Sequence, residues 1–332
     1  MERKQKILGI GHCCQDTICT VEAYPPEDGS THILSMDDSQ GGGAVATALA
    51  AAAKLGASCA MIGFVGDDPT GSRILEGLGS FGVDVSGVRR IPGGRSSSSI
   101  VMVNPATGSR TKFPYRDALP PLPFNREQRE RIAGASILHL DGTRYENALR
   151  AAEIAREAGT LVSLDGCSRQ TDNAKNLRLA EMADILITNA VYPFAVSGKA
   201  DRDEALAFLA GLGKKKAVVM TGGKEGCWAF LEGRAVHFPA FPVQAVDTTG
   251  AGDVFHGAFL VRWLETEDPV SAIRFASAAA ALKCLWPGGR AGIPSREAAD
   301  RAAESFSASS PVSDPVSPGV SLSPEPGDPG IF

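Results

Sequence analysis

The segment 246–257, VDTTGAGDVFHG, combines small residues, an acid and the start of an apolar helical pattern. Gly250, Ala251 and Gly252 allow a ligand to come close to their backbone N–H groups, and the periodic run behind them predicts a helix N-terminus. The unpaired amides and the helix dipole both favour an anion, so we predict an oxyanion or phosphate hole. Asp253 lies at its rim, where a carboxylate can accept the proton of a hydroxyl group that attacks phosphorus. The alternative is an ordinary capped helix with an acid in its first turn.

Two other glycine clusters lack the common nucleotide-binding patterns. The run 9–11, GIG, follows an apolar stretch, but Cys14 stands where a dinucleotide fingerprint needs its third glycine. The run 222–224, GGK, is followed by Glu225, and Val218 stands where a Walker motif has its first glycine. Neither a Rossmann nor a Walker site is therefore predicted.

Short apolar runs alternate with helical patterns along most of the chain. This alternation is typical of βαβ units, and it predicts an α/β fold with a mostly parallel sheet covered by helices on both faces. A ligand is then expected at the carboxyl ends of the strands. The predicted strands are 6–11, 57–64, 136–140, 160–165, 184–188, 216–221, 226–231 and 234–238. The predicted helices are 43–55, 69–80, 126–133, 145–158, 174–182, 202–211, 251–265 and 268–286.

Two strand-rich segments, about 12–40 and 95–116, interrupt this alternation. The second reads as a hairpin, with strands at 96–103 and 109–115 around the turn-forming sequence NPATG. We predict that the two segments pair into a small β-sheet that covers the strand ends as a lid. Two unrelated surface excursions are the alternative.

Composition limits the class of protein. The chain has 332 residues, 43% of them hydrophobic and 21% charged, with a formal net charge of -5, which indicates a folded protein without the basic surface that nucleic acid needs. The longest apolar run, 44–53, is too short to span a membrane. Seven scattered cysteines indicate a reducing, cytoplasmic setting. Residues 1–304 are expected to form one domain, and the Ser/Pro-rich segment 305–332 a disordered tail.

The string DTTGAGD, residues 247–253, resembles the signature of the ribokinase, or phosphofructokinase-B, family of sugar kinases, and the resemblance extends over residues 5–300. It implies a ribokinase-like three-layer α/β/α sandwich with a small β-sheet lid, and ATP and Mg²⁺ as cofactors. It also implies that Asp253 is the catalytic base and that the 250–252 amides form the anion hole. Family members often bind K⁺ beside this loop, so Asp247 and Thr249 become candidate monovalent-cation ligands.

The resemblance extends to a sugar site near the N-terminus. Asp16 matches the aspartate that binds sugar hydroxyls in the family. The sequence GGxxxT at 42–47 is similar to the family pattern GGxxxN, in which Gly42 and Gly43 would let the backbone approach the sugar. Thr47 stands in the asparagine position, and a hydroxyl cannot supply two amide hydrogens, so the sugar contacts must differ.

An ATP site is implied at the C-terminal half of the sheet. Thr221, Gly223 and Gly226 match the TxGxxG loop that lines the ATP phosphates and ribose. Asn189 matches the first residue of an NxxE motif, but Tyr192 replaces the acid. Magnesium is therefore expected to be held by water and ATP oxygens.

Within the family, Thr47, the missing acid and the stretches 250–257 and 274–294 look like the sulfofructose kinases. That resemblance implies transfer to the C1 hydroxyl of 6-deoxy-6-sulfofructose, with Arg144 reaching the sulfonate. Ser30 and Thr31 replace a lid lysine of those enzymes, and Lys112 and Arg116 are the candidate substitutes for its charge.

The sequence is also consistent with other functions, and it predicts an oligomeric state. The alternatives are a kinase for ribose, fructose, ketodeoxygluconate or adenosine, and a non-catalytic sugar- or nucleotide-binding regulator. We also expect a homodimer through the lid, because exposed edge strands tend to pair.

Overall fold

The computed structural model describes residues 6–106, 109–115, 119, 123–167 and 172–307. Its main body is a nine-stranded sheet in the order β13-β12-β11-β10-β9-β8-β1-β4-β5. Neighbouring strands from β11 to β5 pair in parallel. Strand β12 pairs antiparallel with both of its neighbours, β11 and β13. The strands are β1 Lys6–Ile10, β4 Ser58–Gly66, β5 Asp84–Ile91, β8 Ile137–Leu140, β9 Leu161–Gly166, β10 Ile185–Thr188, β11 Ala217–Thr221, β12 Cys227–Leu231 and β13 Arg234–Phe238.

Helices cover both faces of this sheet, as predicted. They are α1 Ala44–Lys54, α2 Pro69–Ser80, α3 Arg126–Gly134, α4 Tyr145–Glu157, α5 Asn173–Met182, α6 Tyr192–Ser197, α7 Arg202–Ala210, α8 Ala251–Thr266, α9 Pro269–Lys283 and α10 Arg296–Ser307. Neighbouring strand residues point to opposite faces, so Ile7 of β1 belongs to the core under α1, α2, α8, α9 and α10, and Leu8 to the core under α3–α7. A continuous apolar strand therefore serves two cores, which confirms the three-layer α/β/α architecture.

Close packing of α1 against α8 sets the geometry near the site. A Cβ atom added at Gly257 of α8 would lie 2.2 Å from the carbonyl oxygen of Ala48 in α1. Only glycine allows this approach, and the alanines of α1 extend the contact. Helix α1 begins at the predicted sugar-binding glycines, and α8 begins at the predicted anion hole. The contact between the two helices therefore sets the position of the predicted sugar site relative to the predicted anion hole.

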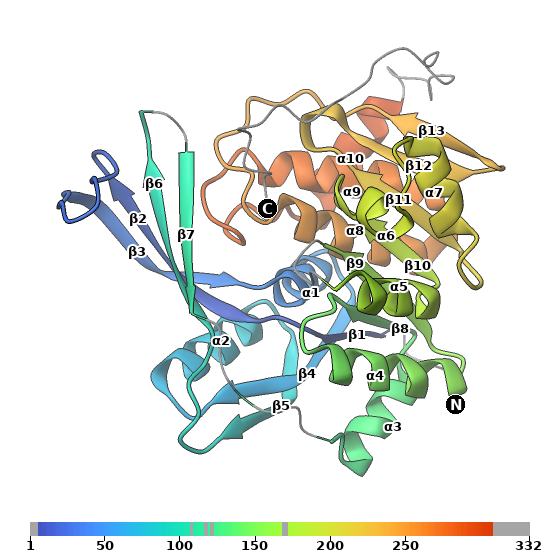
Figure 1. Cartoon of the computed structure of the whole chain (residues 1–332), viewed down its shortest axis with the longest axis horizontal. Coiled ribbons are helices and arrows are strands. Elements are labelled where there is room, and N and C mark those ends of the chain that lie inside the picture. The colour runs from blue at the N-terminus through green and yellow to red at the C-terminus, as the bar shows by residue number, and fades with distance from the viewer. Residues whose placement is uncertain (1–5, 107–108, 116–118, 120–122, 168–171, 308–332) are drawn as a thin grey trace.

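The two interrupting segments do pair into a second sheet, as predicted. Its order is β3-β2-β6-β7, with β2 Cys14–Val21, β3 Ile33–Gly42, β6 Ser98–Asn104 and β7 Ser109–Tyr115. Figure 1 shows this sheet projecting from the body, beside the loops around α8 and α9. Strands β6 and β7 pair antiparallel, as the predicted hairpin requires. Residues 107–108 at its turn and the candidate residue Arg116 lie outside the described residues.

The structure departs from the prediction in several elements. Strand β5 and helices α6 and α10 were not predicted, and α9 ends at Lys283 rather than 286. Helix α10 reaches Ser307, and the rest of the predicted tail, 308–332, lies outside the described residues. Among the described residues, no helix is both long and apolar enough to cross a membrane.

Candidate active site

The predicted anion hole is the N-terminus of α8. Gly250 has a φ of 75° and its Cβ position would lie 2.6 Å from the carbonyl oxygen of Gly289, so the conformation and the close contact both require glycine. In front of Gly252 no atom lies within 4 Å of where a Cβ would stand. Asp253 is half-buried in the first turn. The exposed backbone of Gly252 therefore stands next to a carboxylate, while the N–H of Ala251 donates to the carbonyl oxygen of Thr248 at 3.1 Å.

Asp16 lies on β2 and contacts the glycines that begin α1. Its Oδ1 accepts hydrogen bonds from the hydroxyl of Ser99 at 2.5 Å and from the thiol of Cys14 at 3.3 Å. Its Oδ2 lies 2.4 Å from the position that a Cβ of Gly42 would take. Three sequence-distant segments therefore hold this carboxylate against a bare stretch of backbone.

Gly43 and Thr47 hold the start of α1. Gly43 has a φ of 96°, and a Cβ there would lie 2.3 Å from the carbonyl oxygen of His12. Thr47 is 1% exposed, and its hydroxyl accepts a hydrogen bond from Nε of Arg290 at 3.2 Å. The threonine thus binds a protein guanidinium where the family pattern has an asparagine.

Arg290, which the sequence analysis did not single out, joins this cluster. It is 4% exposed, and it also donates to the carbonyl oxygen of Gly42 at 2.8 Å. Burial lowers the pKa of this guanidinium, while the nearby groups Cys14, Asp253 and Asp16 act in the opposite direction. Arginine nevertheless stays protonated. Its hydrogen bonds go to neutral oxygens, and the carboxylates of Asp16 and Asp253 act on its charge from nearby.

Arg144 occupies the loop between β8 and α4. It stands before α4 with a φ of 55°, donates to the carbonyl oxygen of Leu119 at 2.7 Å and lies over the ring of Phe64, with its Cζ 5.7 Å from the ring centroid. The buried Asp141, which the sequence analysis also did not single out, holds the loop before Arg144. Its Oδ1 accepts a hydrogen bond from the N–H of Thr143 at 2.9 Å. Its other oxygen accepts from the N–H of His12 at 2.8 Å, which links the loops after β8 and β1.

The predicted ATP loop follows β11. The hydroxyl of Thr221 donates to the carbonyl oxygen of Thr188, on the neighbouring strand, at 3.0 Å. Gly223 has a φ of 58° and open space around its Cβ position, whereas a Cβ at Gly226, with a φ of 92°, would lie 2.1 Å from the carbonyl oxygen of Phe238. The loop is thus a tight glycine turn held between strands, with backbone exposed on one side.

The side chain of Asn189 caps α6. Its Oδ1 accepts from the N–H groups of Val191 at 3.1 Å and Tyr192 at 2.9 Å. Tyr192 is 2% exposed and donates its hydroxyl hydrogen to the carbonyl oxygen of Asn176 at 3.0 Å. The residue in the acid position therefore packs in the core and leaves magnesium no carboxylate here.

Asp247 joins three segments. Its Oδ1 accepts from the guanidinium of Arg110 on β7 at 2.9 Å and from the N–H of Thr249 at 2.8 Å, and its Oδ2 accepts from the N–H of Gly288 at 2.8 Å. Burial would raise the pKa of this carboxyl, but the Thr249 and Gly288 hydrogen bonds and the charge of Lys283 outweigh burial and lower it. Lys112 lies two residues beyond Arg110 and so on the same face of the lid strand.

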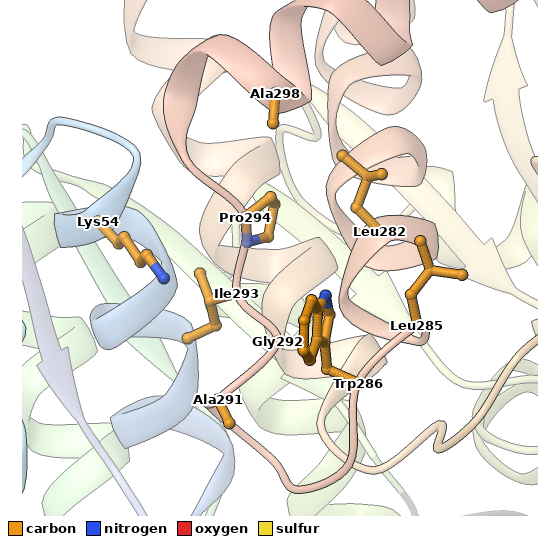
Figure 2. Close-up of a pocket in the computed structure, with 9 residues that line it drawn as sticks. All are labelled: Lys54, Leu282, Leu285, Trp286, Ala291, Gly292, Ile293, Pro294 and Ala298. Atoms are coloured by element: carbon orange, nitrogen blue, oxygen red, sulfur yellow. The ribbon is translucent and has the colours of Figure 1, made fainter.

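A pocket of about 310 Å³ is formed in part by Ala291 and Gly292, which follow Arg290 in the chain, and Figure 2 shows the residues that line it. Apart from Lys54, its walls are apolar side chains and backbone. It is lined by Lys54, Leu282, Leu285, Trp286, Ala291, Gly292, Ile293, Pro294 and Ala298. None of the predicted site residues belongs to it, and it offers no acid to a reaction.

A helix N-terminus open to an oxyanion, next to an acid, is suited to phosphoryl transfer. This points to a phosphotransferase that acts on a hydroxyl group. The model described as "pfkB family carbohydrate kinase" matches residues 4–296, and the chain belongs to this family.

Named relatives agree with that membership. The chain is 31% identical over 300 residues to the ATP-dependent ribose-1-phosphate kinase of Halopiger xanaduensis, covering 90% of this chain and 97% of that protein. It is 30% identical over 316 residues to fructokinase-1 of rice, Oryza sativa, covering 88% and 95%. The structure of Arabidopsis thaliana ribokinase complexed with ribose and ATP superposes with a TM-score of 0.80 at 26% identity, covering 91% of this chain and 99% of that one. The ribokinase-like fold is thereby confirmed.

Proposed function

We propose that this protein transfers the γ-phosphate of ATP to a primary hydroxyl of a ketose-type sugar. The observation that carries the proposal is the loop 288–290. Gly289 contacts Gly250 of the anion hole, and Arg290 binds Gly42 beside Asp16. The loop therefore brings the predicted phosphate and sugar sites to one place.

In the proposed reaction Asp253 accepts the hydroxyl proton as the sugar oxygen bonds to the γ-phosphorus and the bond to the ADP oxygen breaks. The amides of Gly250, Ala251 and Gly252 stabilise the charge on the transferred group. Thr221, Gly223 and Gly226 hold the nucleotide, and Asp16, Gly42 and Gly43 hold the sugar. Positioning and electrostatics supply most of the rate in such a transfer, and the base supplies less.

Magnesium fits this site as a companion of ATP. It supplies charge neutralisation on the phosphates. Because Asn189 caps a helix and Tyr192 is buried, we propose that the ion keeps water and ATP oxygens as its ligands.

We propose that the sugar is anionic, with 6-deoxy-6-sulfofructose as the first candidate. A buried Arg290 that binds only neutral oxygens next to Asp16 and Gly42 supports an acidic group on the substrate, since a buried guanidinium is stabilised by an anion. Lys112 adds a second cation, because it lies on the same face of β7 as Arg110, which binds Asp247 of the body. A relative named for ribose 1-phosphate also supports an anionic substrate. Arg144, which binds Leu119, is the weaker candidate for this contact.

A neutral sugar is the second candidate, because relatives named ribokinase and fructokinase match the chain over most of its length. The two candidates differ in what Arg290 does. With an anionic substrate it binds the ligand, and with a neutral sugar it only holds Thr47 and Gly42 in place.

The test is an ADP-release assay on 6-sulfofructose, fructose, fructose 6-phosphate, ribose, ribose 1-phosphate, ketodeoxygluconate and adenosine. Asp253→Asn should lower turnover by about 10²–10⁴-fold, while Asp203→Asn, an exposed acid in the first turn of α7, should change nothing. Arg290→Lys should raise KM for an anionic sugar more than for a neutral one. ATP binding without turnover on any sugar would refute the kinase, and equal KM changes would refute the anionic substrate.

We further propose a homodimer through the lid, in a cytoplasmic protein. Cross-strand partners place Met36, Ile100, Phe113 and Tyr115 on one face of the lid, and each is at least 47% exposed. None of the seven cysteines, all of which lie in the described part of the chain, forms a disulfide, and this suits a reducing compartment. Light scattering should give twice the monomer mass for the wild type and the monomer mass for Phe113→Asp. A monomeric wild type would refute the dimer.

A further inference from the structure

The protein's own donors surround Asp247, one of the two candidate ligands for a monovalent cation. Both carboxylate oxygens accept hydrogen bonds, Oδ1 from Arg110 and Thr249 and Oδ2 from Gly288. Its backbone carbonyl oxygen accepts from Nζ of Lys283 at 2.8 Å. Every oxygen that Asp247 would offer to a cation is therefore already bonded to a donor of the chain.

Lys283 brings a full positive charge to this position. It is the last residue of α9, it is fully buried, and its ammonium also approaches the carbonyl oxygen of Trp286 at 3.5 Å. Carbonyl oxygens around a compact charge are the environment that an alkali ion would take. Charges of like sign repel strongly in a partly dry site, so an added K⁺ beside this ammonium is unfavourable.

Arg110 adds a second charge from the lid. Besides Asp247, its guanidinium donates to the hydroxyl oxygens of Thr249 and, at 3.2 Å, Thr248. The side chain is 22% exposed and that of Asp247 18%, so solvent screens the pair only in part. The other candidate cation ligand, Thr249, thus binds the same guanidinium. The residues present do not fit a bound K⁺.

We propose that Lys283 and Arg110 replace the monovalent cation beside the anion hole, so that this enzyme needs no K⁺. The ammonium neutralises the loop from the body side, and the guanidinium neutralises it from the lid side. The inference rests on the proposed function for its meaning in catalysis, but the structural claim concerns cation binding and is measurable without any substrate.

The first experiment measures thermal unfolding of the full chain in potassium chloride and in choline chloride at equal concentration. The wild type should unfold at the same temperature in both. Lys283→Ala removes the ammonium and leaves the carbonyl oxygens of Asp247 and Trp286, so K⁺ should raise its unfolding temperature by about 2 °C or more over choline. The matched control is Lys54→Ala, because Lys54 also ends a helix but is exposed and lies in the pocket of Figure 2.

The second experiment measures the rate of ADP release in the same two salts. Wild-type and Lys54→Ala rates should be equal in both, whereas Lys283→Ala should be about 10-fold faster in K⁺, a gain that corresponds to about 1.4 kcal/mol. Arg110→Met, on the lid, should show the same K⁺ response if Lys283→Ala does not fold. A K⁺-specific rise in the wild-type unfolding temperature or rate would overturn the proposal. Absence of turnover on every sugar, with equal wild-type unfolding temperatures, would refute the kinase and leave the cation assignment standing.

Discussion

Acidification should weaken the fold through two buried histidines, His139 of β8 and His256 of α8. His139 is 1% exposed and His256 4% exposed, and their ring centroids are 5.4 Å apart. Nε2 of His139 and Nδ1 of His256 have no hydrogen-bond partner among the described residues. Burial lowers the pKa of His139 to about 3 and that of His256 to about 4. Both rings are therefore neutral in the folded protein at any pH above about 5.

The sign follows from where the protons bind. In the unfolded chain each histidine takes a proton near its ordinary pKa of about 6.5, whereas the folded chain does not. Between about pH 6.5 and 4 the unfolded state therefore binds more protons, and the free energy of unfolding falls as the pH falls. From about pH 7.5 to about pH 5, each histidine costs about 2 kcal/mol, or about 4 kcal/mol for the pair. That is a large part of a typical total of about 5–15 kcal/mol.

Urea unfolding at about pH 7.5 and about pH 5 measures this loss. Carboxyl groups contribute little in this window, since their ordinary unfolded pKa lies near 4. His139→Gln with His256→Gln should remove most of the pH dependence, and His32→Gln, an exposed histidine, should leave it unchanged. If the double variant lost as much stability on acidification as the wild type, the assignment to these two rings would be wrong.

Three further substitutions test the geometry of the site. Gly226→Ala places a Cβ 2.1 Å from the carbonyl oxygen of Phe238 and should raise KM for ATP with little change in KM for the sugar, as initial-rate kinetics would show. Gly257→Ala should force α1 from α8, because its Cβ would lie 2.2 Å from the carbonyl oxygen of Ala48; we expect a loss of about 1–3 kcal/mol in urea unfolding and a lower kcat. Tyr192→Phe removes a buried hydrogen bond to α5 and should cost about 1 kcal/mol in stability, with the Mg²⁺ dependence of turnover unchanged.

Local patterns identified most of the main sheet because its strands are buried on both faces and read as continuous apolar runs. Strand β5 did not follow that pattern. It is an edge strand whose sequence DVSGVRRI mixes charged and apolar residues, and its valines, Val85 and Val88, pack against the core while only partly buried. The single turn of α6 was missed for another reason, since its short sequence carries no period and depends on the Asn189 cap.

Some residues of the candidate site could likewise be found from local sequence patterns, and others could not. Residues within one motif, such as Gly250 and Asp253, could be proposed from the string alone. Arg290 could not, because its role comes from contact with Thr47, 243 positions earlier. Its signal was indirect. The hydroxyl at Thr47 in place of an amide predicted only that the sugar contacts differ, and the structure places the guanidinium of Arg290 against that hydroxyl. The proposed cation ligands were likewise assigned by resemblance, which carried no information about Lys283 or Arg110.

The contact between the loop 288–290 and the two helix starts has a consequence for how specificity can change. This loop belongs to the body, and it links Gly250 to Gly42 directly, whereas β7 and β6 contact the neighbouring Asp247 and Asp16 through Arg110 and Ser99. A lid with other side chains would therefore present a different sugar to an unchanged reaction centre. For protein engineering, the exposed positions of β7 are the ones to randomise when a new acceptor is wanted, while Gly289 and Arg290 should be kept constant.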